Sequence, residues 1–168
     1  MDFDVVVNCS GVNSYHLVND RKVVPIRGQA IKVRAPWHKV MVAVFHDNFV
    51  THSTPKSNYV ILGATKEAGR WDSNVYSSDR VDIFERNCKF VPSLRNAEIL
   101  SDFASVRPGR SSIRVEKEIM KFGPHRIPVV HNYGHGGSGI TFHWGCAQDA
   151  AKLVQQCLQD LSNLTSKL

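Results

Sequence analysis

The stretch IPVVHNYGHGGSGITFHWGCAQDAAKLVQQCL, residues 127–158, determines how the last part of the chain folds. Residues 127–131 are a short run rich in β-branched side chains, which is typical of a strand. From Thr141 onward apolar residues recur every three or four positions, which predicts an amphipathic helix with one buried stripe. That stripe comprises Cys146, Ala150, Leu153, Val154, Cys157 and Leu161. The sequence therefore predicts a strand and a helix joined by a glycine-rich loop.

The loop itself, GHGGSG at residues 134–139, matches the pattern G-x-G-x-x-G. A dinucleotide fingerprint also needs a second strand and an acidic residue about 20 positions further on. The residues after the helix supply neither, so we do not expect a pyrophosphate site here. Two interpretations stay open: a loop and helix N-terminus that contact another part of a ligand, or a strand-to-helix turn that only packs.

Composition limits the class of protein. The chain has 168 residues, 42% of them hydrophobic, which is enough for a sizeable globular core. A formal net charge of +6 raises nucleic acid as a partner. Because Lys and Arg are scattered among Asp and Glu, we expect a solvated basic surface, with no nucleic-acid or membrane partner. Cysteines without C-x-x-C spacing predict reduced thiols, at Cys9, Cys88, Cys146 and Cys157.

Several further strands are expected before the glycine loop. Residues 4–8, DVVVN, are a continuous apolar run typical of a fully buried strand. Residues 30–34 alternate apolar and basic side chains, which predicts a half-exposed strand. Other strands are expected over residues 40–44, 59–63, 98–106 and 112–118, with a polar loop through Pro55.

One helix is expected between the strands at 59–63 and 98–106. Ser77 or Ser78, with Asp79, is expected to cap it, and Pro92 is expected to end it. Its buried face is expected to comprise Val81, Phe84 and Cys88. The order of these elements predicts a mixed α/β chain with much antiparallel sheet.

The stretch SVRPGRSSIRV places three arginines around a Pro-Gly turn: Arg107, Arg110 and Arg114. A planar guanidinium binds a carboxylate through two parallel hydrogen bonds, so each is a candidate anion anchor. His131 and His135 would form a metal pair only on a helix, which Gly134 and Gly136 disfavour, so no metal is expected. No activated nucleophile is recognisable, and chemistry carried by a cofactor would not need one.

The final residues Ser166, Lys167 and Leu168 match a peroxisomal targeting signal. The polar residues before this tail favour its exposure. We therefore expect the protein in the peroxisomal matrix and a peroxisomal import receptor among its partners.

Taken together, the motifs resemble the C-terminal half of the D-amino-acid oxidase and D-aspartate oxidase family. They are VVVNCSG, RGQAIKVRAPW, SVRPGRSSIRVEKE, HNYGHGGSGITFHWG and the terminal SKL, in family order over residues 2–168. The resemblance implies part of a two-domain α/β FAD oxidase, with a Rossmann-like FAD domain and a mixed, largely antiparallel substrate-domain sheet. It implies a partial FAD-binding domain at 1–25, a substrate-binding domain at 26–120, a returning FAD-domain strand, glycine loop and helix at 121–165, and a targeting tail at 166–168.

The resemblance also implies residue roles. Arg107 matches the arginine that binds the substrate α-carboxylate and orients the substrate for catalysis, and Gly137 lies where the substrate amine is bound. Ser10 matches a position near FAD, and the loop that contacts the flavin matches Gly136, Gly137, Ser138, Gly139, Ile140 and Thr141. His52, three residues before Pro55, aligns with the family's active-site tyrosine, and this departure leaves the role of His52 unassigned.

The implied activity is FAD-dependent oxidative deamination of a D-amino acid by molecular oxygen, giving a 2-oxo acid, ammonia and hydrogen peroxide. Lys66 matches a basic residue of the acidic-substrate branch, whereas the GHGG loop is closer to the neutral branch. We expect D-aspartate or D-glutamate as substrate. The alternatives are a neutral D-amino-acid oxidase and a truncated, non-catalytic isoform that cannot hold FAD.

Overall fold

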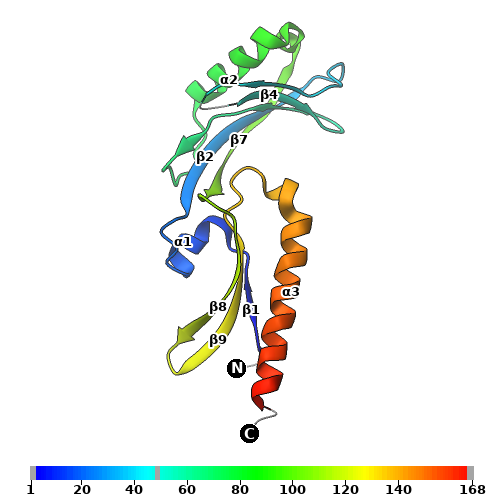
Figure 1. Cartoon of the computed structure of the whole chain (residues 1–168). Helices are drawn as coiled ribbons and strands as arrows, with labels where there is room; N and C mark the ends of the chain where they lie inside the picture. The colour runs from blue at the N-terminus through cyan, green and yellow to red at the C-terminus, as the bar shows by residue number, and fades with distance from the viewer. Residues whose placement is uncertain (1–2, 48–49, 166–168) are drawn as a thin grey trace. The chain divides into compact units, whose positions relative to one another are not determined.

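A computed structural model describes residues 3–47 and 50–165, which form a mixed α/β structure with antiparallel sheet, as the sequence predicts (Figure 1). The chain divides into two compact units. Unit 1 comprises Met1–Val24 and Arg107–Leu168, and unit 2 comprises Pro25–Val106. The assignment of residue ranges to FAD-binding and substrate-binding domains stays a prediction.

Unit 1 contains a three-stranded sheet in the order β1-β9-β8. Strand β1 (Val6–Asn8) pairs in parallel with β9 (His125–Tyr133), and β9 forms an antiparallel hairpin with β8 (Arg114–Phe122). The long helix α3 (Gly139–Thr165) packs against β8 and β9 and runs alongside them in Figure 1. The short helices η1 (Gly11–Asn13) and α1 (Ser14–Leu17) follow β1 along the chain.

The apolar stripe predicted for the last helix is confirmed. All six of its side chains are buried or half-buried, whereas most other α3 residues are exposed. Ala150 and Cys157 form a core cluster with Val130 of β9, and Leu153 and Val154 pack against it. The helix begins at Gly139, two residues before the predicted start.

The run at residues 4–8 is not the fully buried strand that its composition predicts. Only residues 6–8 form β1, and Val7 is 48% exposed. The physical reason is that one face of β1 is uncovered among the described residues, since Val7 is exposed whereas its neighbour Asn8 is buried. A continuous apolar run becomes fully buried only when both faces of the strand are covered.

Unit 2 contains the larger sheet, in which β2 (Val24–Arg34) pairs antiparallel with β5 and β6 and also pairs with β7. The predicted alternation in this strand is confirmed, because Ile31 and Val33 are fully buried while Arg34 is exposed. The remaining strands are β3 (Val42–Phe45), β4 (Val50–Pro55), β5 (Val60–Gly63), β6 (Glu67–Ala68) and β7 (Glu98–Gly109).

Strand β4 corrects the prediction of a polar loop through Pro55. Its sequence VTHSTP is mostly polar, yet Thr51 and Ser53 are buried and pair across to β3. Because this strand is mostly polar, a hydrophobicity pattern does not detect it. The neighbouring strands β3 and β5 lie close to their predicted positions.

Helix α2 (Ser77–Phe90) covers one face of the unit 2 sheet over β4 and β5 (Figure 1). It ends just before Pro92, as predicted, and η2 (Pro92–Asn96) follows. The predicted cap is wrong, since Tyr76 occupies the N-cap position without a side-chain hydrogen bond. The predicted buried face is partly wrong, because Val81 is 62% exposed while Ile83 and Cys88 are buried.

A buried arginine in β2 stabilises the connection before α2. Arg27 is fully buried and forms ion pairs with Glu67, with Asp79 at 2.9 Å and with Asp72 at 3.5 Å. Gln29 accepts a further hydrogen bond from the Arg27 guanidinium at 2.9 Å.

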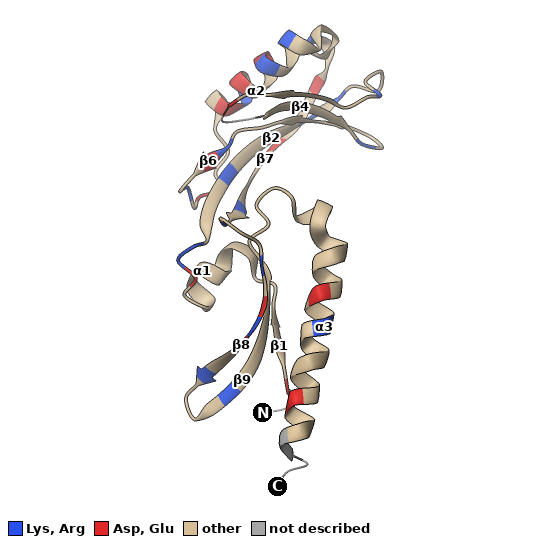
Figure 2. Ribbon diagram, viewed as in Figure 1, with Lys and Arg blue, Asp and Glu red and all other residues tan. Residues whose placement is uncertain are grey.

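Elsewhere charges of both signs are interspersed, as Figure 2 shows along α2. No helix among the described residues is long and apolar enough to cross a membrane.

Candidate functional site

Arg107, near the end of β7, is half-buried and has no counter-charge among residues 3–47 and 50–165. The described part of the chain supplies no ion pair or hydrogen bond to its side chain, although burial is sufficient to lower its pKa by desolvation. A cation held in this way is stabilised when an anion binds. Of the three candidate arginines, Arg107 is therefore the one available to a carboxylate.

The other two arginines have structural partners in unit 1. Arg110 donates from Nε to Asp20 Oδ2 at 3.0 Å, and Arg114 donates to Tyr133 Oη at 2.6 Å. Tyr133 in turn donates to the same Asp20 oxygen at 2.8 Å. Burial raises the pKa of Asp20, but hydrogen bonds from Tyr133, the Lys22 amide and Arg110 outweigh it and leave this pKa below its usual range.

The glycine loop lies against the turn that carries Arg107. The amide of Gly136 donates to the Pro108 carbonyl at 2.8 Å, and a Cβ on Gly137 would lie 3.8 Å from Arg107 Cδ. Gly134 has φ +88°, and a Cβ there would meet Arg110 Cβ and Cδ at 3.0 Å. The structure thus brings together Arg107 and the predicted loop residues Gly136 and Gly137.

The start of α3 presents free backbone donors. The amide of Ser138 donates to His135 O at 3.0 Å, and the amide of Phe142 donates to Ser138 O at 3.1 Å, so helical bonding begins there. The amides between them, at Gly139, Ile140 and Thr141, precede the first intrahelical bond. Ile140 is 86% exposed, and a Cβ on Gly136 would meet nothing within 4 Å.

These features fit a ligand group that carries negative charge and approaches the backbone closely. The open space at Gly136 allows close approach to the backbone, and the N-terminus of a 27-residue helix favours negative charge. The predicted FAD-contacting residues Gly136 to Thr141 comprise the end of the glycine loop and the start of α3, and their specific roles stay predictions.

A second polar cluster lies at the carboxyl end of β1. Ser10 donates from Oγ to Asn8 Oδ1 at 2.6 Å, and its Oγ lies 2.7 Å from Ser14 Oγ. Asn8 Nδ2 lies 3.2 Å from Nδ1 of His131, whose Nε2 lies 3.2 Å from Glu118 Oε2. Burial, followed by the charge of Arg114, lowers the pKa of the fully buried His131. His131 therefore belongs to a structural hydrogen-bond network.

Lys66 and His52 belong to unit 2. Lys66 is exposed, follows β5, and lines a cavity of about 380 Å³ together with Glu67, Asp79 and Asp82. His52 lies opposite Gly63 in the β4–β5 pair, and its ring fills the space that a Gly63 side chain would occupy. The tail Ser166, Lys167 and Leu168 lies outside the described residues.

Two residues that organise the site were not predicted from the sequence. Asp20 stands alone in a loop, and Tyr133 was part of a quoted motif without an assigned role. Their contact spans 113 residues of sequence, so no local pattern could reveal it. The isolated acid before the basic pair Arg21 and Lys22 was the one available signal. The described residues contain no group of three His, Cys, Asp or Glu side chains that could hold a metal.

Comparison with known proteins gives one family. A family model described as FAD dependent oxidoreductase matches residues 2–153. The D-aspartate oxidase of Homo sapiens is 38% identical over 159 residues, covering 95% of this chain and 46% of that protein. The D-amino-acid oxidase of Rubrobacter xylanophilus is 42% identical over 156 residues, covering 92% of this chain and 47% of that protein.

Solved structures agree on the architecture. Glycine oxidase from Geobacillus kaustophilus superposes with a TM-score of 0.74 at 26% identity, over 90% of this chain and 41% of that one. Iminodiacetate oxidase from Chelativorans sp. BNC1, at 21% identity and a TM-score of 0.76, shows the same fold over 93% of this chain and 43% of that one. The chain spans about half the length of the curated relatives that it matches.

Proposed function

The chain belongs to the FAD-dependent oxidoreductase family, and on that basis we propose that the protein carrying it oxidises D-amino acids to a 2-oxo acid, ammonia and hydrogen peroxide. Relatives named as D-aspartate and D-amino-acid oxidases support this reaction class. The observation that carries the proposal is the half-buried Arg107, which has no partner in the described part of the chain and lies beside the open glycine loop.

FAD is the cofactor of this family, and the residues of unit 1 fit part of it. In the proposal, the flavin ring would contact the loop Gly136–Gly137–Ser138 and the amides of Gly139, Ile140 and Thr141. Ser10 would lie near the cofactor. When bound, the cofactor supplies the acceptor for a hydride from the substrate Cα. The α3 N-terminus contributes a positive potential that favours negative charge on the ring.

Arg107 orients the substrate. Its planar fork binds the substrate α-carboxylate through two charge-assisted hydrogen bonds, which fixes the position of the adjacent Cα. Gly137, beside Arg107, is assigned to the substrate amine. Because the hydride leaves with the bonding electrons, no protein nucleophile is required, consistent with the absence of a recognisable one in the sequence.

The substrate class in this proposal is acidic, D-aspartate or D-glutamate. Support comes from the resemblance of Lys66 to the basic residue of the acidic branch and from the D-aspartate oxidases among the relatives. In the Lys66 cavity Glu67 and Asp79 already pair with Arg27, which leaves the Lys66 ammonium less opposed than the acidic lining suggests. The proposal assigns the exposed Lys66 ammonium to pair with the distal carboxylate of such a substrate.

The test is peroxide production by the oxidase that contains this chain, with D-aspartate, D-glutamate, D-alanine and L-aspartate. We expect activity with the D-enantiomers alone and a higher kcat/KM for D-aspartate than for D-alanine. Lys66→Ala should lower kcat/KM for D-aspartate about tenfold, equivalent to ~1.4 kcal/mol, and spare D-alanine. Faster turnover of D-alanine by the unmodified enzyme would assign it to the neutral branch, and no peroxide from any D-amino acid would refute the reaction.

We also propose a peroxisomal location, supported by the C-terminal Ser166, Lys167 and Leu168. Oxidases that release hydrogen peroxide are suitably placed in a compartment that degrades it. Deleting these three residues should move a fluorescently tagged chain from punctate structures to the cytosol. Unchanged punctate fluorescence would show that another segment carries the targeting information.

A further inference from the structure

The side-chain amide of Asn8, at the end of β1, has an orientation that its neighbours determine. Its Oδ1 accepts from the backbone N–H of Ser10 at 3.1 Å and from Ser10 Oγ at 2.6 Å. Because a backbone N–H can only donate, the atom that it faces must be the amide oxygen. The Nδ2 group of Asn8 is therefore the one that lies next to His131.

This orientation also assigns the tautomer of His131. Asn8 Nδ2 lies 3.2 Å from Nδ1 of His131, and an amide NH2 group can only donate, so Nδ1 must be the unprotonated nitrogen. The ring proton of neutral His131 is then on Nε2, which lies 3.2 Å from Glu118 Oε2. Each hydrogen bond between Ser10 and Glu118 therefore has a fixed direction.

The same directions leave Ser10 Oγ as an acceptor. Its proton is committed to Asn8 Oδ1, because an oxygen–oxygen contact of 2.6 Å needs a proton and Oδ1 carries none. The 2.7 Å contact between Ser10 Oγ and Ser14 Oγ is then a bond that the fully buried Ser14 donates. Ser10 is half-buried, so a bound molecule can reach its remaining lone pair. Such a molecule meets a hydroxyl that accepts but cannot donate.

Protonation of His131 would reverse these directions. A proton on Nδ1 places an N–H group against the NH2 group of Asn8, and this contact is relieved when the amide rotates by half a turn. The Asn8 oxygen then accepts from His131, and its NH2 group faces Ser10. Ser10 Oγ loses the acceptor for its own proton and becomes a donor to any bound molecule.

The charged groups around His131 come from β8 and act in opposite directions. Burial, followed by the charge of Arg114, lowers the pKa of His131, whereas Glu118 and Glu116 oppose this shift. The side chains of β1 and α1 in the network are uncharged amide and hydroxyl groups. His131 is therefore neutral at neutral pH, and the network changes direction only on acidification.

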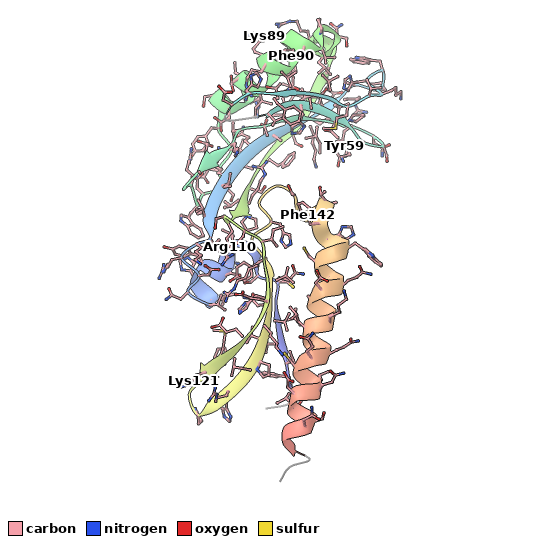
Figure 3. The ribbon with its side chains drawn as sticks, in the orientation of Figure 1. Tyr59, Lys89, Phe90, Arg110, Lys121 and Phe142 are labelled. Atoms are coloured by element: carbon pink, nitrogen blue, oxygen red, sulfur yellow. The ribbon has the colours of Figure 1, made fainter. Side chains whose placement is uncertain are left out.

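The charges beyond these groups are paired with one another. Tyr133 contacts the His131 ring edge-on, with 5.7 Å between the ring centroids, and donates to Asp20 at 2.8 Å. Asp20 in turn pairs with Arg110, which is labelled in Figure 3. This pair places no unopposed charge next to the His131 ring.

We propose that Asn8 and His131 are positioning residues that hold Ser10 Oγ as a hydrogen-bond acceptor for a hydroxyl or amino group of the cofactor. This inference rests on the proposed function, in which Ser10 lies near FAD. FAD carries hydroxyl and amino donors on its sugar and ring groups, and its pyrophosphate oxygens only accept. A hydroxyl whose proton is already committed suits the donors and not the pyrophosphate.

NMR of the apo form of the oxidase that contains this chain, labelled with nitrogen-15 in histidine and serine, tests the network itself. We expect neutral His131 to carry its proton on Nε2, and the Ser10 amide signal to shift as His131 titrates. A proton on Nδ1 of neutral His131 would overturn the proposal. So would a Ser10 amide signal that does not follow the titration of His131.

The dissociation constant of FAD, measured by flavin fluorescence, tests the effect on the cofactor. Below the pKa of His131 we expect FAD binding to weaken about fivefold, the effect of one hydrogen bond. Unchanged or tighter binding would overturn the proposal, and tighter binding would show that Ser10 meets an acceptor such as a pyrophosphate oxygen. An oxidase that binds no FAD at any pH would refute the proposed cofactor, and the NMR signals would still decide the network.

Asn8→Asp distinguishes this mechanism from a general effect of acid. A carboxylate accepts from Ser10 and from protonated His131 at the same time, so the pKa of His131 should rise and FAD binding should no longer weaken on acidification. Asn13→Asp is the matched control, because it adds the same charge at an exposed position of η1 where the side chain makes no capping hydrogen bond. It should keep the pH dependence of the unmodified oxidase. The proposal fails if the two variants behave alike.

Discussion

The amide of Gly136 donates a 2.8 Å hydrogen bond to the carbonyl of Pro108, which joins the glycine loop to the turn that carries Arg107. Because this bond is made by the main chain, the relative position of the two segments does not depend on a particular side chain at either residue. Gly137 then lies beside Arg107, with 3.8 Å between its would-be Cβ and Arg107 Cδ. The candidate carboxylate anchor and the candidate flavin loop are thus one structural element within unit 1.

The backbone of this loop predicts different costs for two glycine substitutions. Gly136→Ala should destabilise the chain by about 1 kcal/mol, since φ is +56° but the space around it is open. Gly134→Ala should cost about 2–3 kcal/mol, because φ is +88° and the new Cβ would contact Arg110 at 3.0 Å. Urea unfolding of the two variants measures the difference. Equal costs would contradict the described packing of Arg110 on the loop.

The Asp20 side chain should fix the position of the glycine loop through Arg110. Its side chain is 7% exposed and binds Arg110 and Tyr133, so Asp20→Asn leaves a buried arginine without its counter-charge and should cost roughly 3 kcal/mol. Hydrogen exchange of the Gly136 amide should quicken as the loop loosens. Asp149→Asn removes a carboxylate from an exposed pair with Lys152 and should change stability by less than about 1 kcal/mol. Unaltered Gly136 exchange in Asp20→Asn would show that the loop is fixed without Asp20.

Stability should fall on mild acidification because of His131. Burial lowers its pKa from 6.5, so the unfolded chain takes up a proton at a higher pH than the folded chain does. As pH drops below about 6.5, the unfolded state binds more protons, and the free energy of unfolding decreases by up to ~1.4 kcal/mol per pH unit. His131→Gln should reduce this dependence, whereas His125→Gln, at an exposed hairpin position, should not. Identical pH profiles for the three chains would refute this role.

Local patterns were sufficient for the regular parts of the fold. The period of α3 predicted its buried face because one helix face contacts one sheet, and the alternation in β2 predicted which of its side chains are buried. The pattern failed where tertiary context decides burial. In α2, Val81 lies on the apolar stripe but faces solvent, because the sheet contacts the helix at Ile83 and Asn87 instead, the latter donating to Gly63 O at 3.3 Å.

In the candidate site, too, local sequence patterns predicted part of the arrangement and tertiary contacts decided the rest. The residue chemistry alone gave the three arginines equal standing and the family resemblance selected Arg107, and the structure then separated them by their partners. Arg110 and Arg114 are held by Asp20 and Tyr133, which lie far away in the sequence, so only the folded chain reveals that Arg107 has no such partner among the described residues. Buried ion pairs such as those of Arg27 are similarly invisible to a hydrophobicity pattern, since a basic residue is usually exposed.

The central claim is that Arg107 binds the substrate carboxylate, and steady-state kinetics of Arg107 variants in the oxidase that contains this chain test it most directly. Arg107→Leu should lower kcat/KM for D-aspartate by a factor corresponding to about 2–5 kcal/mol, because the charge-assisted fork is lost. Arg107→Lys should recover part of the loss, since it restores charge without the two parallel hydrogen bonds. Arg126→Leu, at an exposed position of β9, should match the unmodified enzyme. A kcat/KM for Arg107→Leu within about twofold of the Arg126→Leu value would contradict the assignment of Arg107 as the carboxylate anchor.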